Sequence, residues 1–158
     1  MLLPIKRILS PTDFSEPSYA ALKIAAELAG HFKAALDVLH VIAPVPVISP
    51  SPETLTPGSD APSYPEQLTL QKEKVLKDLL GKMVSQEIPT AAAIRAGEAV
   101  QEIVAYAAKE PIDLIVIASH GQSGWRRLIT GSVTEQVVRL SPSPVLVIQE
   151  PRGEKPEK

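Results

Sequence analysis

Residues 114–140 read LIVIASHGQSGWRRLITGSVTEQVVRL, and their pattern alone indicates the fold class of the chain. It begins with the continuously apolar run LIVIA, which is typical of a strand buried on both faces of a parallel sheet. It ends with SVTEQVVRL, in which Val133, Val137 and Leu140 fall on one face of a helix. A segment rich in glycine, hydroxyl groups and arginine joins the two. A strand, a loop and a helix in this order predict one unit of an α/β fold.

The same alternation extends in both directions along the chain. Further strands are expected at residues 5–10, 35–42, 90–95 and 144–149, and further helices at residues 15–30, 68–86 and 97–110. Alternating strands and helices predict an open, five-stranded parallel sheet with helices on both faces.

The apolar spacing also predicts which helix faces are buried and where the first helix ends. Gly30 is placed to end the first helix. In the second helix, Val75, Leu79 and Met83 share a face that should pack on the sheet, with Leu76 beside them.

One domain is expected over residues 1–150, because 158 residues with 44% hydrophobic content are enough to bury one core. The proline-rich loop at residues 43–65 is either a mobile surface excursion or a functional segment such as a lid or a partner contact. Residues 151–158 are charged and contain proline, so a flexible tail is expected there.

Charge and composition exclude several function classes. A net charge of −2 and an aromatic content of 4% argue against a nucleic-acid partner, which would need a basic excess or base-stacking rings. The start MLLPIKRILS is too interrupted for a signal peptide, and no later run is long enough to span a membrane. The chain has no cysteine for a disulfide or a thiolate metal site. A cytoplasmic protein without a membrane partner is expected.

The expected ligand site lies between two irregular loops. In open parallel sheets, ligands bind at the carboxyl ends of the strands where the strand order reverses. The loops PTDFSEP (residues 11–17) and ASHGQSGWRRLITGS (residues 118–132) follow the first and fourth strands.

The second loop has features of a phosphate site. Ser132 and Glu135 have capping-box spacing, which marks a helix N-terminus whose amides and positive dipole end favour an anion. The glycines let a polyphosphate approach the backbone, while hydroxyl and cationic side chains can add contacts. The alternative is an ordinary capped helix after a loop with solvated arginines. The residues of this expected site are His120, Gly121, Arg126, Arg127, Gly131, Ser132 and Thr134.

The first loop offers one carboxylate. Asp13 and Glu16 also have capping-box spacing, so Asp13 is either the cap of the first helix or a carboxylate that accepts hydrogen bonds from a ribose. His40, on the second strand, is expected to be a buried structural histidine.

Together these motifs resemble the universal stress protein family over residues 6–148. PTDFSE follows the first strand, LHVI ends the second, and ASHG is followed by nine residues and then GS. The last feature is similar to the family's nucleotide pattern of glycine, two residues, glycine, nine residues, glycine and serine or threonine. Ala118 stands where that pattern begins with glycine. Its methyl group would crowd a ligand if the backbone needs a positive φ, and would otherwise be harmless.

Family members that keep the pattern bind ATP, so the resemblance implies ATP, accompanied by Mg²⁺, at the ends of the first and fourth strands. It implies a Rossmann-like sheet of the adenine nucleotide alpha hydrolase type with strand order 3-2-1-4-5. It places Asp13 near the ribose and the backbone of Val41 at the adenine, although Val41 would also serve as a plain core residue. The implied binding residues are Pro11, Thr12, Asp13, Val41, Ala118, Gly121, Gly131, Ser132, Val133 and Thr134, to which the phosphate-site interpretation adds His120 and Arg127.

The resemblance also implies a homodimer through the last strand, which would otherwise be a hydrophobic sheet edge. The implied interface residues are Val145, Leu146, Val147 and Ile148. A further protein partner is left open.

We expect a nucleotide-dependent stress-response switch or binding module, and at most a slow ATPase. No general base stands near the expected phosphates, and the P-loop pattern is absent. Two alternatives remain. One is a dimeric scaffold that no longer binds nucleotide. The other is a phosphoacceptor domain with Asp13 as the acceptor, against which the third strand ends in Arg95-Ala96-Gly97 instead of acidic residues.

Overall fold

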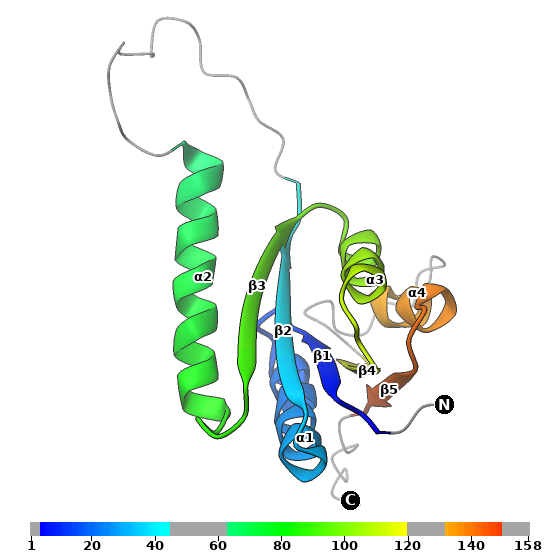
Figure 1. Ribbon diagram of the computed structural model, residues 1–158. Coiled ribbons are helices and arrows are strands. Elements are labelled where there is room, and N and C mark those ends of the chain that lie inside the picture. The colour runs from blue at the N-terminus through cyan, green and yellow to red at the C-terminus, as the bar shows by residue number, and fades with distance from the viewer. Residues whose placement is uncertain (1–3, 45–62, 120–131, 150–158) are drawn as a thin grey trace, which may run out of the picture.

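Five parallel strands form one sheet in the order β3-β2-β1-β4-β5 (Figure 1). The computed structural model describes residues 4–44, 63–119 and 132–149. This arrangement confirms the expected α/β class and the expected strand order. The strands are β1 (Arg7–Pro11), β2 (Ala35–Ile42), β3 (Thr90–Ala96), β4 (Leu114–Ala118) and β5 (Val145–Ile148).

The helices cover both faces of the sheet (Figure 1). Helices α1 (Glu16–Phe32) and α2 (Tyr64–Met83) pack on one face, and α3 (Ala99–Lys109) and α4 (Val133–Leu140) pack on the other. Helices connect the strands because parallel strands need long crossover connections. Within the described ranges, no helix has the length and apolar character needed to cross a membrane.

Each face of the sheet has its own apolar core. Ile8 of β1 turns towards α1, and its neighbour Leu9 turns towards α3, because successive strand side chains point to opposite faces. Leu36 and Leu39 of β2 divide between the two cores as well, and both are 0% exposed. Burial of each such side chain contributes about 1.5–3 kcal/mol.

Helix α1 differs from the prediction at both ends. Its N-cap is Ser15, whose side chain accepts a hydrogen bond from the Ser18 amide, so the capping role considered for Asp13 is wrong. The helix also passes through Gly30 and ends at Phe32. Lys33 adopts the left-handed conformation, with φ of 54°, and its amide bonds the last carbonyl groups, so this helix end does not need a glycine.

Helix α2 starts earlier than predicted and buries a neighbouring residue. It begins at Tyr64 because Ser63 and Glu66 form a capping contact, in which the Ser63 amide lies 2.7 Å from Glu66 Oε2. Leu76 is fully buried, whereas Val75 is 42% exposed. Adjacent residues lie about 100° apart around a helix. The apolar spacing therefore found the apolar side of α2 but centred it on Val75 and not on Leu76.

Helices α3 and α4 also depart from the predicted pattern. Helix α3 begins at Ala99, two residues later than expected, because Gly97 has a φ of 154° and Glu98 is the N-cap. In α4 only Val137 of the predicted stripe is fully buried, and Val133 and Leu140 are exposed.

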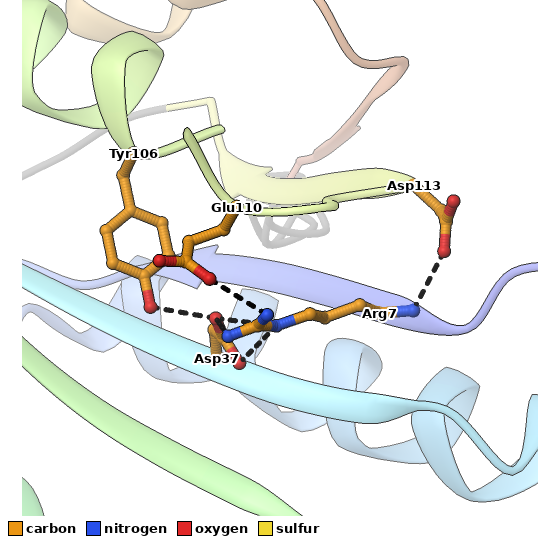
Figure 2. A network of polar contacts seen from close by, with 5 residues as sticks. All are labelled: Arg7, Asp37, Tyr106, Glu110 and Asp113. Atoms are coloured by element: carbon orange, nitrogen blue, oxygen red, sulfur yellow. Dashed lines mark hydrogen bonds and ion pairs between the residues drawn. The ribbon is translucent and has the colours of Figure 1, made fainter. Parts of the chain in front are cut away.

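A polar network ties α3 to the amino end of the sheet (Figure 2). The Arg7 guanidinium lies 2.8 Å from Asp37 and 2.9 Å from Glu110. The Tyr106 hydroxyl donates to Asp37 Oδ2 at 2.8 Å. Burial, followed by the contact with Asp37, raises the pKa of Tyr106 to about 12. Asp113 accepts a hydrogen bond from the Arg7 amide at 3.0 Å, which joins β1 to the start of β4. The network fixes the end of the sheet opposite to the carboxyl ends of the strands.

Candidate functional site

A cavity of about 390 Å³ lies at the carboxyl ends of the strands, on the face covered by α3 and α4. It brings together the two loops that the sequence singles out, since residues after β1 and at the start of α4 line the same space. Every predicted nucleotide-binding residue within the described ranges lines this cavity. These are Pro11, Thr12, Asp13, Val41, Ala118, Ser132, Val133 and Thr134.

The remaining predicted residues lie outside the described residues. They are His120, Gly121, Arg126, Arg127 and Gly131.

The β1 loop is held by a directional chain of hydrogen bonds. The Ser18 hydroxyl donates to the Ser15 carbonyl at 2.8 Å, so its oxygen accepts the proton of the Thr12 hydroxyl, 3.0 Å away. The Thr12 hydroxyl oxygen in turn accepts the Phe14 amide at 3.1 Å. The proton of the Thr12 hydroxyl is therefore engaged within the protein, and this side chain shapes the loop that borders the cavity.

Asp13 is oriented by Ser15. Asp13 Oδ1 accepts the Ser15 amide at 3.0 Å and also the Ser15 hydroxyl. These contacts hold the carboxylate ahead of the helix, beside the cavity that it lines. A carboxylate fixed in this way is an acceptor for hydroxyl groups of a ligand.

The start of α4 forms the opposite wall. Ser132 is the N-cap, and its side chain accepts the Glu135 amide at 3.2 Å, as the capping-box spacing predicts. This contact uses a lone pair of the Ser132 hydroxyl and not its proton. The Thr134 hydroxyl donates to the Ala118 carbonyl at 2.6 Å, so this side chain joins α4 to β4 and its single proton is already engaged.

Ala118 ends β4 in the extended conformation of a strand. It pairs with Ile148 of β5, and it is not among the described residues with a positive φ. Its side chain is 7% exposed. The backbone conformation at this position therefore does not require the glycine with which the family pattern begins.

Val41 and His40 face opposite sides of the sheet. Val41 lines the cavity, whereas His40 lies behind it, 8% exposed, with its ring centroid 4.3 Å from that of Phe14. Burial lowers the pKa of His40, and the nearby Lys72 lowers it further, against the raising effects of the Thr12 carbonyl and Asp13. The expectation of a buried structural histidine agrees with this position.

Several residues of the cavity wall were not predicted from the sequence. Ser18 could have been found from its position one turn after Ser15, and Leu39 from its strand spacing of two to Val41. The others carry no chemical signal, since they are small or apolar residues that differ in no way from core positions. The missed residues are Ser18, Leu39, Ala99, Ile103 and Ile117.

No cluster of three or more acidic, histidine or cysteine side chains able to hold a metal occurs in the described part of the chain. The hydroxyl groups and the carboxylate at the cavity can bond the hydroxyl groups of a sugar, and the helix N-terminus can bind a phosphate.

Comparison with known proteins gives the family. The model of the Universal stress protein family matches residues 4–149. Universal stress protein MJ0531 of Methanocaldococcus jannaschii is 31% identical over 150 residues, which cover 94% of this chain and 85% of that protein.

Solved structures give the same result for the fold. Universal stress protein UspA from Lactobacillus plantarum superposes with a TM-score of 0.68 at 25% identity, covering 91% of this chain and 97% of its own. A universal stress protein in complex with cAMP shares the fold with a TM-score of 0.66 at 19% identity, covering 92% of this chain and 97% of its own. One from Archaeoglobus fulgidus in complex with dAMP does so with a TM-score of 0.59 at 18% identity, covering 90% and 96%. On the family match over nearly its whole length, this chain belongs to the universal stress protein family.

Proposed function

We propose that this protein binds ATP in the cavity at the carboxyl ends of β1 and β4 and acts as a nucleotide-dependent switch or binding module in a stress response. The observation that carries the proposal is the convergence of Asp13, Val41 and Ser132, which are far apart in the sequence, on one cavity of about 390 Å³. Small-molecule sites typically enclose about 300–1,000 Å³, so the space is adequate for a nucleotide.

The walls of the cavity suggest how ATP would lie. Leu39, Val41 and Ile103 offer an apolar wall for the adenine. Asp13 offers a carboxylate for the ribose hydroxyls. The first amides of α4 have no acceptor within the helix, and the positive end of the helix dipole lies at the same place. Both features favour an anion, so this helix N-terminus suits the phosphates.

Mg²⁺ would enter with the triphosphate. The hard, oxygen-binding ion is normally held through substrate phosphates with one or two protein ligands at most. The described cavity residues fit this arrangement because they offer hydroxyl groups and a single carboxylate.

Two solved neighbours support the adenine nucleotide class, because their complexes hold cAMP and dAMP. The preference for ATP rests on the family's nucleotide pattern, of which this chain keeps Gly121, Gly131 and Ser132.

We also propose a homodimer that forms through β5. This strand is at the edge of the described sheet, where it pairs with β4 only. Leu146 is 39% exposed on β5, and Val138 and Leu140 of α4 are 50% and 57% exposed. Pairing with a second copy would cover the strand edge and these apolar side chains. The cytoplasmic location and the role of residues 43–65 stay predictions.

The proposal is tested by calorimetric titration of the nucleotide-stripped protein with Mg-ATP, with AMP and GTP as comparisons. We expect micromolar binding that favours ATP. The substitution Asp13→Asn should weaken binding about tenfold, because the amide oxygen of asparagine still accepts a hydrogen bond but a bond to a charged acceptor is stronger by about 1–1.5 kcal/mol. Asp78→Asn, a matched change on the exposed side of α2, should leave it unaltered. Absence of binding by the folded, unsubstituted chain would reject the proposal and favour the scaffold alternative.

A further inference from the structure

We propose that His40 is a positioning residue for the nucleotide site, and that it acts with Phe14 to hold the Thr12–Asp13 turn and to join that turn to helix α2. The inference rests on the proposed function, because it assigns the residues that shape the ligand loop from the far side of the sheet.

The side chain of His40 holds the turn by a hydrogen bond to the backbone of Thr12. The side chains of Leu39 and Val41 line the cavity, so His40, which lies between them on β2, points to the opposite face. Its Nδ1 is 2.8 Å from the Thr12 carbonyl oxygen. A carbonyl oxygen only accepts, so Nδ1 carries the proton and donates it. The Thr12 amide donates to the Leu39 carbonyl at 2.8 Å. Residues of β2 therefore bond both the amide and the carbonyl of Thr12.

Phe14 completes the turn in a conformation that bulky residues avoid. Its φ of 63° lies in the left-handed region, which costs an L-residue about 1–2 kcal/mol. The ring contact with His40, at a centroid distance of 4.3 Å, and the hydrogen bond from the Phe14 amide to Thr12 offset this strain. The left-handed residue reverses the chain directly after Asp13, so the carboxylate stays beside the cavity while the chain enters α1.

Lys72 joins this pair to α2. Its Nζ lies 5.3 Å from the centroid of the Phe14 ring, within the range of a cation–π contact. Burial lowers the pKa of His40 and so favours the neutral ring; Lys72 acts in the same direction, and the Thr12 carbonyl and Asp13 act in the opposite one. A neutral His40 avoids placing a second positive charge beside Lys72.

A polar ring at this position needs an explanation beyond packing. Leu36 and Val38, the fully buried residues on the same face of β2 as His40, are apolar, and an apolar side chain would fill the same space. Burying an imidazole is unfavourable unless it makes its hydrogen bonds. Here its bond goes to a residue that lines the ligand cavity, so the bond serves the geometry of the turn.

The test compares three variants of the full chain by calorimetric titration with Mg-ATP, each shown by circular dichroism to be folded at the temperature used. His40→Leu keeps the volume but removes the donor. His40→Asn places an amide nitrogen near the position of Nδ1 and should restore the bond. Leu36→Ala is the control, because it destabilises the same strand away from the cavity.

We expect His40→Leu to weaken ATP binding about tenfold, equivalent to about 1.4 kcal/mol. His40→Asn should recover most of that loss, and Leu36→Ala should bind like the unsubstituted protein. Because His40 acts through the turn that carries Asp13, the two substitutions should not be additive. The double variant His40→Leu/Asp13→Asn should lose less binding free energy than the sum of the losses in the two single variants.

The inference is overturned if folded His40→Leu binds as tightly as the unsubstituted chain, or if His40→Asn is as weak as His40→Leu. Either result would leave the proposed function intact. If the unsubstituted chain itself binds no ATP, the proposed function and this inference fall together, and the first titration already reveals it.

Discussion

At the scale of single residues, the conformation of Ala118 indicates whether this departure from the family pattern affects ATP binding. The residue is extended and paired with Ile148, so the backbone does not need the conformational freedom of glycine. Ala118→Gly should therefore change the affinity for ATP less than about threefold, while the greater freedom of the unfolded chain lowers the free energy of unfolding by about 0.5–1 kcal/mol. Calorimetry and urea denaturation measure the two quantities. A large gain in affinity would show that the methyl group crowds the ligand.

Residue roles were predictable where the chemistry is local. The Ser132 cap follows from its spacing to Glu135, and the structure has that contact. The cap of α1 was not predictable, because Asp13 and Ser15 are both good capping residues and the left-handed Phe14 decides between them. The engaged proton of Thr134 also could not be foreseen, since its acceptor is a backbone carbonyl 16 residues earlier in the chain.

At the scale of elements, the Arg7, Asp37 and Tyr106 network anchors α3 to the amino end of the sheet (Figure 2). Tyr106→Phe removes the hydrogen bond to a buried carboxylate and should lower the free energy of unfolding at pH 7 by about 1.5–3 kcal/mol. Because the network lies opposite to the cavity, the affinity for ATP should not change. Urea denaturation and calorimetry check both expectations, and an altered affinity would show that the two ends of the sheet are coupled.

The same residue predicts a dependence on high pH. The pKa of Tyr106 is raised from its ordinary value of 10 to about 12 in the folded protein. The unfolded chain therefore releases this proton first, so the contribution of Tyr106 is complete below pH 10 and is lost as the pH rises from 10 towards 12. The difference in unfolding free energy between the original protein and Tyr106→Phe should shrink over that range. A constant difference would contradict the raised pKa.

The order of the elements could be predicted because buried parallel strands and amphipathic helices have distinct periods. Their ends were less certain, as at Gly30, where glycine is inside the helix and Lys33 ends it. The amino-end network was missed altogether, since Asp37 within an apolar strand and Tyr106 on a helix show no relation until the fold brings them together.

At the scale of the whole molecule, β5 is the edge through which we propose that two copies pair. Leu146→Lys puts a charge on this edge and should convert the dimer to a monomer that stays folded. Leu70→Lys is the matched control, because Leu70 is also an exposed leucine but lies on α2. Sedimentation velocity distinguishes the two states. A Leu146→Lys protein that remains dimeric, or an unsubstituted protein that is monomeric, would rule out this interface.

The site at which the nucleotide binds can be located directly by NMR spectroscopy. Titrating ¹⁵N-labelled protein with Mg-ATP and following the backbone amide signals identifies the residues that contact it. We predict that the signals of Thr12, Asp13, Val41 and Ala118 shift, and that those of Asp37 and Tyr106 stay unchanged. Shifts confined to the amino end of the sheet, or none at saturating ATP, would contradict a nucleotide site at the carboxyl ends of β1 and β4.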